Sequence, residues 1–403
     1  MKEISKVKTY LEKNIESLTS EFNILKKINY PLITNLYFSY QDKEYIFLIL
    51  DYLSGGTLRS HIPETPPPNP LFSEPQIKFL ISNIILSLEY IHNKGIIHRD
   101  LKPENLLFDE KGYLHLTDFG ISKIYNPENF QIYDKSGTPG YIPPEMIKGE
   151  PQNYVSDFFG LGIITYELIF GKRPFNGKNR NEIKQEVLHK DIKIRKSDLP
   201  KDNYWDYNIC SFVNLLLKRK ACLRLGYKGI FEIMEHEFLK DINWKKIEKK
   251  EVNSPFYINE NNENFNSDYV NQADDENIYQ NKKKYFINIV NESGFFKSFY
   301  FNREEYETNI SYYDVNKNRN KVIRGIYHSY EFDNRTSTVR GNTNDRTNEI
   351  SIFHKLGRKK SQIISPYKLN EKDNDDDISE IQEENSHTNL YNNNEDYSYS
   401  SLD

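Results

Sequence analysis

The sequence predicts an α+β fold in which helices predominate and a few short strands pair locally. Two long segments, 73–93 and 154–170, carry apolar residues at the three-to-four-residue spacing of helices. Two short apolar and aromatic segments, 36–40 and 45–50, flank a charged turn, which is typical of a β-hairpin. The composition changes near residue 257, where we expect the folded region to end.

The two parts of the chain differ in composition. Residues 1–257 hold 16 of the 17 prolines and a net charge of +3, whereas residues 258–403 hold 26 asparagines and a net charge of −8. Such a polar segment cannot bury enough apolar surface to offset its ordering entropy, so we expect a mostly disordered, low-complexity tail. An aromatic stretch at 285–301 is the exception. It could equally dock on a folded surface or lie exposed in a disordered chain.

An early helix is expected where Ile15, Leu18, Phe22 and Leu25 mark one apolar face. Glu21 stands on that face, three residues after Leu18 and four before Leu25. A charge in this position is costly unless it is paired. Glu21 is therefore a candidate for an ion pair.

A longer helix is expected from Ser73 to Asn93. Ser73 suits the N-cap, and Glu74 and Pro75 suit the first turn. The apolar face of this helix comprises Ile77, Leu80, Ile81, Ile84, Ile85, Leu88 and Ile91.

Two short strands are expected next, at 106–108 and 113–116, joined by a turn that contains glycine. Helices are expected at 154–170, 179–190 and 205–219.

Two motifs carry the chemistry: HRDLKPEN and, thirteen residues after its asparagine, DFG. Asp100 can accept a hydroxyl proton, and Lys102 can reach a transferring phosphate. Asn105 offers a neutral oxygen to a metal ion, and Asp118 supplies an anionic metal ligand. Glu104 is expected to face a ribose or the substrate rim. Together these residues predict phosphoryl transfer from Mg-ATP.

With these motifs the chain resembles eukaryotic protein kinases. Residues 1–257 are similar to the AGC group, related to cyclic-AMP-dependent kinase, through NILKKINYPLITNLYFSYQD, DYLSGG, FSEPQIKF, RLG and HEFLKDINWKKIEKKEVNSPF. The resemblance implies a bilobal fold. It divides into an incomplete β-sheet N-lobe (1–53), a mostly helical C-lobe (54–240) and the start of an AGC-type extension (241–257).

The resemblance also implies roles for residues outside the two motifs. Lys102 and Thr138 match serine/threonine kinases. Glu145, in a Pro-Pro-Glu sequence, is expected to pair with Arg224, and Asp157 to hold the backbone of the catalytic loop.

On the nucleotide side, the resemblance makes Leu50 the gatekeeper. Asp51 and Leu53 then supply backbone groups to adenine, and Leu107 belongs to the same cofactor-binding set. In the tail, FKSFYF at 296–301 looks like a C-terminal hydrophobic motif with tyrosine at the usual phosphorylation position.

The chain departs from the family at its start, because no glycine-rich loop precedes the phosphate-binding lysine. Lys2 precedes Glu21 by nineteen residues, the family's separation for the lysine–glutamate pair, so we assign Lys2 to that role. We expect the sequence to begin at an internal methionine of a longer kinase and, as it stands, to bind ATP poorly. The remaining upper sheet would be little more than one hairpin with an exposed edge.

Two further departures bear on regulation and specificity. Asp134 stands where relatives carry a phosphorylated threonine, and it could pair with Arg99 to order the activation segment. Thr57 replaces an acidic residue that basophilic relatives carry. Glu104 and Glu167 remain to read arginines, so the preference for basic substrates is weakened.

The sequence thus implies a serine/threonine protein kinase that uses ATP and Mg²⁺ on protein substrates. The alternative is a catalytically impaired pseudokinase or docking module, favoured by the missing glycine-rich loop. A small-molecule kinase is disfavoured by Gly137-Thr138-Pro139, which binds peptide in relatives.

The remaining features exclude other classes. The charged start is no signal peptide, and the longest apolar stretch, 160–171, is too short to span a bilayer. Cys210 and Cys222 lack metal-like spacing and indicate buried thiols in a reducing compartment. A net charge of −5 argues against nucleic-acid binding. We expect a cytoplasmic monomer, with the nucleus as an open alternative.

Overall fold

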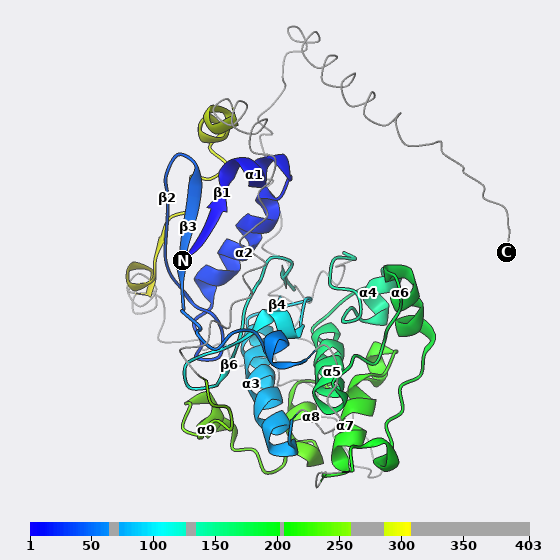
Figure 1. Cartoon of the computed structure of the whole chain (residues 1–403). Helices are drawn as coiled ribbons and strands as arrows, with labels where there is room; N and C mark the ends of the chain where they lie inside the picture. The colour runs from blue at the N-terminus through cyan, green and yellow to red at the C-terminus, as the bar shows by residue number, and fades with distance from the viewer. Residues whose placement is uncertain (64–71, 126–133, 202–204, 259–285, 308–403) are drawn as a thin grey trace, which may run out of the picture. The chain divides into compact units, whose positions relative to one another are not determined.

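The computed structural model describes residues 1–63, 72–125, 134–201, 205–258 and 286–307 (Figure 1). Helices dominate these residues, and the short strands pair antiparallel in three sheets, as the α+β class predicts. All of them belong to one compact unit of the chain. None of the helices in the described ranges is long and apolar enough to cross a membrane.

The N-terminal sheet has four strands in the order β1-β3-β2-β8. The strands are β1 (Lys2–Ser5), β2 (Leu36–Gln41), β3 (Tyr45–Leu50) and β8 (Phe301–Asn302). The β2–β3 hairpin confirms the predicted one. The expectation of little more than a hairpin was wrong, because one strand from the chain start and one from the tail extend it on either side.

Helices α1 (Lys6–Leu11) and α2 (Ile15–Lys27) accompany this sheet (Figure 1). The apolar face of α2 buries Leu18, Phe22 and Leu25 in the core that also contains residues of β3. Glu21 is buried on the same face, as the sequence pattern predicts.

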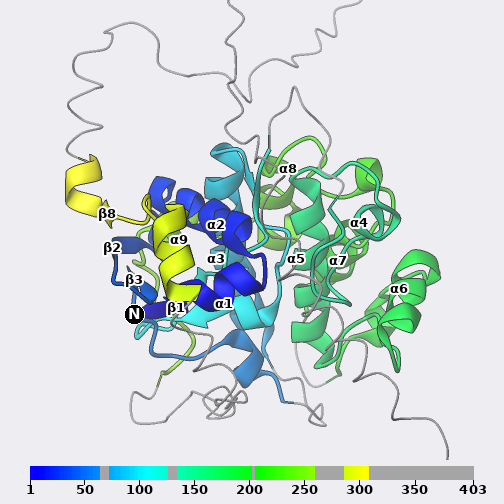
Figure 2. The same cartoon turned by 90° about the horizontal axis from the view of Figure 1, so that it is seen from above.

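The aromatic stretch of the tail docks on this lobe, which decides between the two alternatives left open above. Residues 286–293 are helical, and the segment that follows lies alongside the N-terminal sheet (Figure 2). Phe296 and Phe299 are buried, and Phe299 stacks on Phe22 of α2 with ring centroids 4.7 Å apart. The other residues of the predicted 258–403 tail, apart from Ile258 and residues 302–307, lie outside the described ranges.

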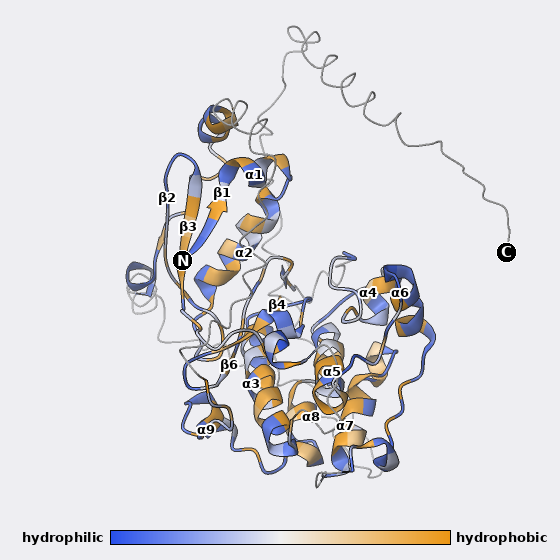
Figure 3. Ribbon diagram, in the orientation of Figure 1, coloured by the Kyte–Doolittle hydropathy of each residue, from blue (hydrophilic) through white to orange (hydrophobic). Residues whose placement is uncertain are grey.

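The C-terminal lobe is mainly helical. Its helices are α3 (Glu74–Asn93), α4 (Pro144–Lys148), α5 (Val155–Phe170), α6 (Arg180–His189), α7 (Asn208–Leu216), α8 (Phe231–Met234) and α9 (Trp244–Glu248). Apolar residues run along the length of α3 and α5, and these two helices contact each other in the core (Figure 3). At the start of α3, Gln76 accepts a hydrogen bond from the Ser73 backbone N–H, which is one half of a capping box.

Short strands of the C-terminal lobe flank the loops that hold the HRDLKPEN and DFG motifs. The strands are β4 (Ile96–Ile97), β5 (Leu106–Phe108), β6 (Leu114–Leu116) and β7 (Lys123–Ile124), paired as β4–β7 and β5–β6. The predicted pair of strands at 106–108 and 113–116 is therefore present, with the second beginning one residue later.

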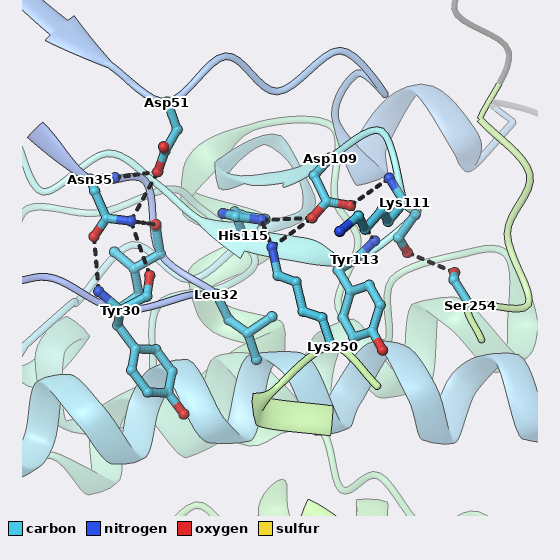
Figure 4. A network of polar contacts seen from close by, with 12 residues as sticks. Tyr30, Leu32, Asn35, Asp51, Asp109, Lys111, Tyr113, His115, Lys250 and Ser254 are labelled. Atoms are coloured by element: carbon cyan, nitrogen blue, oxygen red, sulfur yellow. Dashed lines mark hydrogen bonds and ion pairs between the residues drawn. The ribbon is translucent and has the colours of Figure 1, made fainter. Parts of the chain in front are cut away.

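The residues after α9 are fastened to the β5–β6 hairpin (Figure 4). Lys250 Nζ lies 2.7 Å from Asp109 Oδ2 and 2.9 Å from His115 Nε2. Burial opposes ionisation of Asp109, yet the hydrogen bonds from His115 and Lys250 hold its pKa below the ordinary value. The Ser254 hydroxyl donates to the Gly112 carbonyl. This network fixes the hairpin whose strands flank the catalytic residues.

Candidate active site

The catalytic loop between β4 and β5 is held by one buried carboxylate. Asp157 of α5 accepts the backbone N–H of His98 at 2.9 Å and of Arg99 at 2.7 Å, and it contacts His92 Nε2 at 2.7 Å. Burial opposes its ionisation, but the bond with His92 leaves the pKa of Asp157 below its ordinary value. Arg99 has a φ of 73°, a left-handed backbone that non-glycine residues rarely adopt. The Asp157 bonds hold the loop in this conformation, as predicted.

Three predicted side chains surround the carboxylate of Asp100: Lys102 and Asn105 from the same loop, and Thr138 from the activation segment. Asp100 Oδ2 accepts from Lys102 Nζ at 2.6 Å and from Asn105 Nδ2 at 3.1 Å. Asp100 Oδ1 accepts from the Thr138 hydroxyl at 2.7 Å, and Lys102 Nζ also donates to that hydroxyl at 2.8 Å. Burial raises the pKa of Asp100, but the hydrogen bonds from Lys102 and Thr138 outweigh this effect and hold the pKa below its usual range. Asp100 is therefore an ionised base at neutral pH.

Asp118 lies exposed beside this group, in a left-handed conformation with φ of 64°. The neighbouring Phe119 is fully buried and packs edge-on against His98, which fixes the backbone that presents Asp118. One Asp118 oxygen accepts the Gly120 N–H at 3.1 Å. The exposed carboxylate remains free to bind a cation.

The oxygen ligands fit a magnesium ion. Asn105 donates its amide nitrogen to the Asp100 carbonyl and carboxylate, and these bonds leave the amide oxygen for a metal. An amide oxygen and the Asp118 carboxylate are the hard donors that Mg²⁺ prefers, with phosphate and water completing its shell. The described ranges hold no group of three or more His, Cys, Asp or Glu side chains suited to a metal ion.

The predicted lysine–glutamate pair is formed. Lys2 Nζ lies 2.8 Å from Glu21 Oε1, with Lys2 held in β1 opposite Leu48 of β3. The Ser17 hydroxyl of α2 donates to the Gly120 carbonyl at 2.6 Å. Helix α2 therefore joins the strand that carries Lys2 to the segment that carries Asp118.

The predicted adenine-binding residues are Asp51 and Leu53, which follow β3, and Leu107, which lies in β5. Asp51 follows β3 and donates its backbone N–H to the Asn35 carbonyl at 3.1 Å. Its carboxylate accepts from Asn35 (Figure 4). It also accepts from the Tyr37 hydroxyl at 2.6 Å. Leu53 is buried two residues later, and Leu107 is half-buried in β5.

The activation segment is tied to the catalytic loop through Asp134. Arg99, whose side chain is fully buried, donates to Asp134 Oδ2 at 3.1 Å and to the Asp134 carbonyl at 3.1 Å. Burial opposes ionisation, but hydrogen bonds from Ser136 and Arg99 lower the pKa of Asp134 to about 2. The predicted pair is present, with Gln152 as an additional donor to the Asp134 carbonyl.

Glu145 at the start of α4 forms the predicted pair with Arg224. The two nitrogens of the guanidinium lie 2.7 Å and 2.9 Å from the two Glu145 oxygens, and both side chains are buried. Such a bidentate pair fixes orientation as well as distance. It holds the end of the activation segment on the lower lobe.

One contact was missed by sequence reasoning. Glu104, expected at a ribose or the substrate rim, accepts from Arg59 Nε at 2.8 Å, and Arg59 Nη1 reaches Glu167 Oε1 at 2.9 Å. Thr57 stands where basophilic relatives have an acidic residue. Its side chain caps the 3-10 helix Leu58–His61, which contains Arg59. The signal that could have revealed the contact was an arginine two residues after that replacement.

Comparison with known proteins fits this geometry. Residues 1–239 match the family model described as the protein kinase domain. The chain belongs to the protein kinase family. It is 36% identical over 256 residues to a probable serine/threonine-protein kinase of Dictyostelium discoideum, an alignment that covers 64% of this chain and 54% of that protein.

Other relatives support the resemblance to the AGC group. The chain is 35% identical over 260 residues to serine/threonine-protein kinase sgk-1 of Caenorhabditis elegans, covering 64% of this chain and 53% of the relative. It is 35% identical over 236 residues to ribosomal protein S6 kinase alpha-6 of Mus musculus, covering 59% and 30%. The chain thus spans from about a third to about half the length of these relatives.

Proposed function

We propose that this protein is a serine/threonine protein kinase that transfers the γ-phosphoryl group of Mg-ATP to Ser or Thr hydroxyls of protein substrates. The observation that carries the proposal is the arrangement of Lys102, Asn105 and Thr138 around the buried Asp100 carboxylate. It supplies an ionised proton acceptor next to a cation, with an exposed metal-binding carboxylate nearby at Asp118.

Each residue of this group has a defined task in the proposed reaction. Asp100 Oδ1 orients the substrate hydroxyl and accepts its proton, in the place where the Thr138 hydroxyl now donates. Lys102, which bridges Asp100 and Thr138, neutralises charge on the transferred phosphoryl group. Asn105 and Asp118 would hold the magnesium ion, which supplies charge neutralisation at the phosphates. Lys2, fixed by Glu21, would contact the phosphates from the β1 side.

The Lys102–Thr138 contact favours hydroxyls of serine and threonine as acceptors. Lys102 Nζ donates to the Thr138 hydroxyl at 2.8 Å, and these are the two residues through which the chain resembles serine/threonine kinases. Neither the described residues nor the comparisons favour the pseudokinase alternative. A cytoplasmic location and a monomeric state stay predictions.

The test of the proposal is Asp100→Asn. This change preserves the size of the side chain but removes the proton acceptor, so turnover should fall by about 10²–10⁴-fold. Phosphate transfer to Ser, Thr and Tyr peptides should be measured with Mg-ATP, together with nucleotide affinity and thermal unfolding. Unchanged turnover in Asp100→Asn, or equal rates on tyrosine peptides, would refute the proposal.

A further inference from the structure

An acidic pair adjoins the proposed catalytic group. Glu104 lies in the 3-10 helix Pro103–Asn105, directly after Lys102, and Glu167 lies in α5 with its side chain 4% exposed. Two carboxylates this close to the phosphoacceptor site would favour a guanidinium on the substrate, because a planar fork can bind both.

In this chain an internal guanidinium already occupies the pair. Arg59 Nε donates to Glu104 Oε1 at 2.8 Å, and the two other nitrogens reach Glu167 Oε1 at 2.9 Å and Glu167 Oε2 at 3.2 Å. The Tyr141 hydroxyl lies 2.6 Å from Arg59 Nη2 and donates to Glu167 Oε2 at 2.6 Å. Both Glu167 oxygens are therefore used, and all three Arg59 nitrogens have partners.

Backbone pairing places Arg59 here. The Gly55 N–H donates to the Phe108 carbonyl and the Phe108 N–H donates to the Gly56 carbonyl, so this segment runs beside β5. Thr57 then caps the 3-10 helix by accepting from the Ser60 N–H. These backbone hydrogen bonds hold the segment so that Arg59 lies against Glu104 and Glu167.

We propose that Arg59 is a specificity-determining residue that takes the place of a substrate arginine at Glu104 and Glu167. The proposal rests on the proposed kinase function and names the substrate class of that same site. Of the four carboxylate oxygens, only Glu104 Oε2 has no hydrogen-bond partner in the described part of the chain. One oxygen cannot bind a guanidinium fork in the bidentate way. The protein therefore selects substrates without an arginine contact at this acidic pair.

The test compares peptides that carry one arginine, at each position around a serine, with matched peptides that carry uncharged citrulline there. The ratio of kcat/KM for arginine over citrulline should be close to one at the position facing the pair in the wild-type protein. Arg59→Ala should raise that ratio by roughly tenfold or more, because a charge-assisted hydrogen bond becomes available to the substrate. Glu104→Gln in the Arg59→Ala background should remove the gain. Arg180→Ala, an exposed arginine of α6, is the matched control and should leave all ratios unchanged.

Two further measurements cover other outcomes. Equilibrium binding of the same fluorescent peptides needs no turnover, so an absence of phosphate transfer refutes the kinase proposal while the binding ratios still test Arg59. If Arg59→Ala does not fold, the single variant Glu104→Gln tests the proposal. Its ratio for arginine over citrulline peptides should then equal the wild-type ratio at every peptide position. A strong wild-type preference for arginine that Glu104→Gln abolishes would overturn the proposal, as would unchanged ratios in a folded Arg59→Ala.

Discussion

Three carboxylates of this site differ in their burial and in their hydrogen-bond partners. Asp100 is buried and surrounded by donors that keep it ionised. Asp118 is exposed, and its backbone is held in a left-handed conformation by the burial of Phe119. Asp134 is partly exposed and joined to the buried side chain of Arg99. The three carboxylates therefore suit a base, a metal ligand and a structural tie.

Asp118→Ala should raise the Mg²⁺ concentration needed for half-maximal turnover by roughly tenfold or more, because it removes the anionic ligand and leaves the neutral amide of Asn105. Titration of Mg²⁺ at fixed ATP measures the effect. Asp241→Ala, which alters an exposed aspartate, is the control and should match the wild type. Wild-type metal dependence in Asp118→Ala would remove Asp118 from this role.

Asp134→Ala should loosen the activation segment and lower turnover by a few-fold, since one partly exposed ion pair contributes about 0.2–1 kcal/mol. Limited proteolysis within residues 134–148 should accelerate in the variant, and Asp134→Asn should behave in the same way.

The pH dependence of this tie has a defined sign. The pKa of Asp134 is lowered to about 2 in the folded protein. The ionised carboxylate therefore stabilises the folded segment fully when the pH is above the ordinary pKa of an aspartate, and this stabilisation is lost as the pH falls toward 2. Protease sensitivity of the wild-type segment should therefore rise between about pH 4 and 2 more than that of Asp134→Ala. Equal cleavage of both proteins over this range would show that Asp134 is only a solvated loop residue.

Elements are joined in this protein by a few buried polar contacts. Asp157 of α5 fastens the catalytic loop, and Lys250 fastens the β5–β6 hairpin from beyond α9. Glu145 of α4 is joined to Arg224, which also donates to the Val155 carbonyl at the start of α5. These contacts fix loops that have no regular secondary structure of their own.

Arg224→Met should destabilise the protein by about 3–5 kcal/mol, because it leaves the buried Glu145 carboxylate without its partner. Glu145→Gln should also destabilise it. The double variant should lose less than the sum of the two single losses, since neither partner is then left as an isolated charge. Urea unfolding of the four proteins gives the coupling. Additive losses of less than about 1 kcal/mol each would contradict a structural role for the pair.

At the scale of the whole molecule, a segment from the tail packs against the N-terminal lobe. Residues 286–307 follow the C-terminal lobe in sequence, yet β8 pairs with β2 and covers an edge of the N-terminal sheet. Buried Arg303 donates to backbone carbonyls at the end of α2 and to the carbonyl of Leu36. The sheet and helix α2, with the Lys2–Glu21 pair between them, are thereby held from outside.

Phe299→Ala should destabilise the N-terminal lobe by about 3–5 kcal/mol, because Phe299 is fully buried and stacked on Phe22. Tyr300→Ala is the matched control, since Tyr300 is 64% exposed and its loss should change stability by about 0.5 kcal/mol or less. Denaturant unfolding and hydrogen exchange of β2 amides measure the difference. Equal stability of the two variants would mean that the tail segment does not support this lobe.

Much of the fold could be predicted because its signals are local. The apolar spacing of α3 and α5 follows from the period of a helix, and the β2–β3 hairpin from its charged turn. The phosphoryl-transfer residues lie in two motifs between His98 and Gly120, so the residue types of these motifs and their separation identify the group. The need of Glu21 for a partner was predictable because a charge on an apolar face is costly unless it is paired, and the resemblance to kinases pointed to Lys2 as that partner.

Only the tertiary structure decided what depends on distant contacts. A local pattern shows that a face is buried but does not show what covers it, so the docking of Phe299 on Phe22 could not be read from either segment. The same limit applies to Arg59, whose partners lie 45 and 108 residues away. As a residue type, arginine is most often solvent-exposed, and only the pairing of its segment with β5 brings it to the acidic pair. The sequence therefore determined the chemistry of the site, whereas the packing of distant segments determined which of its charges are left for a substrate.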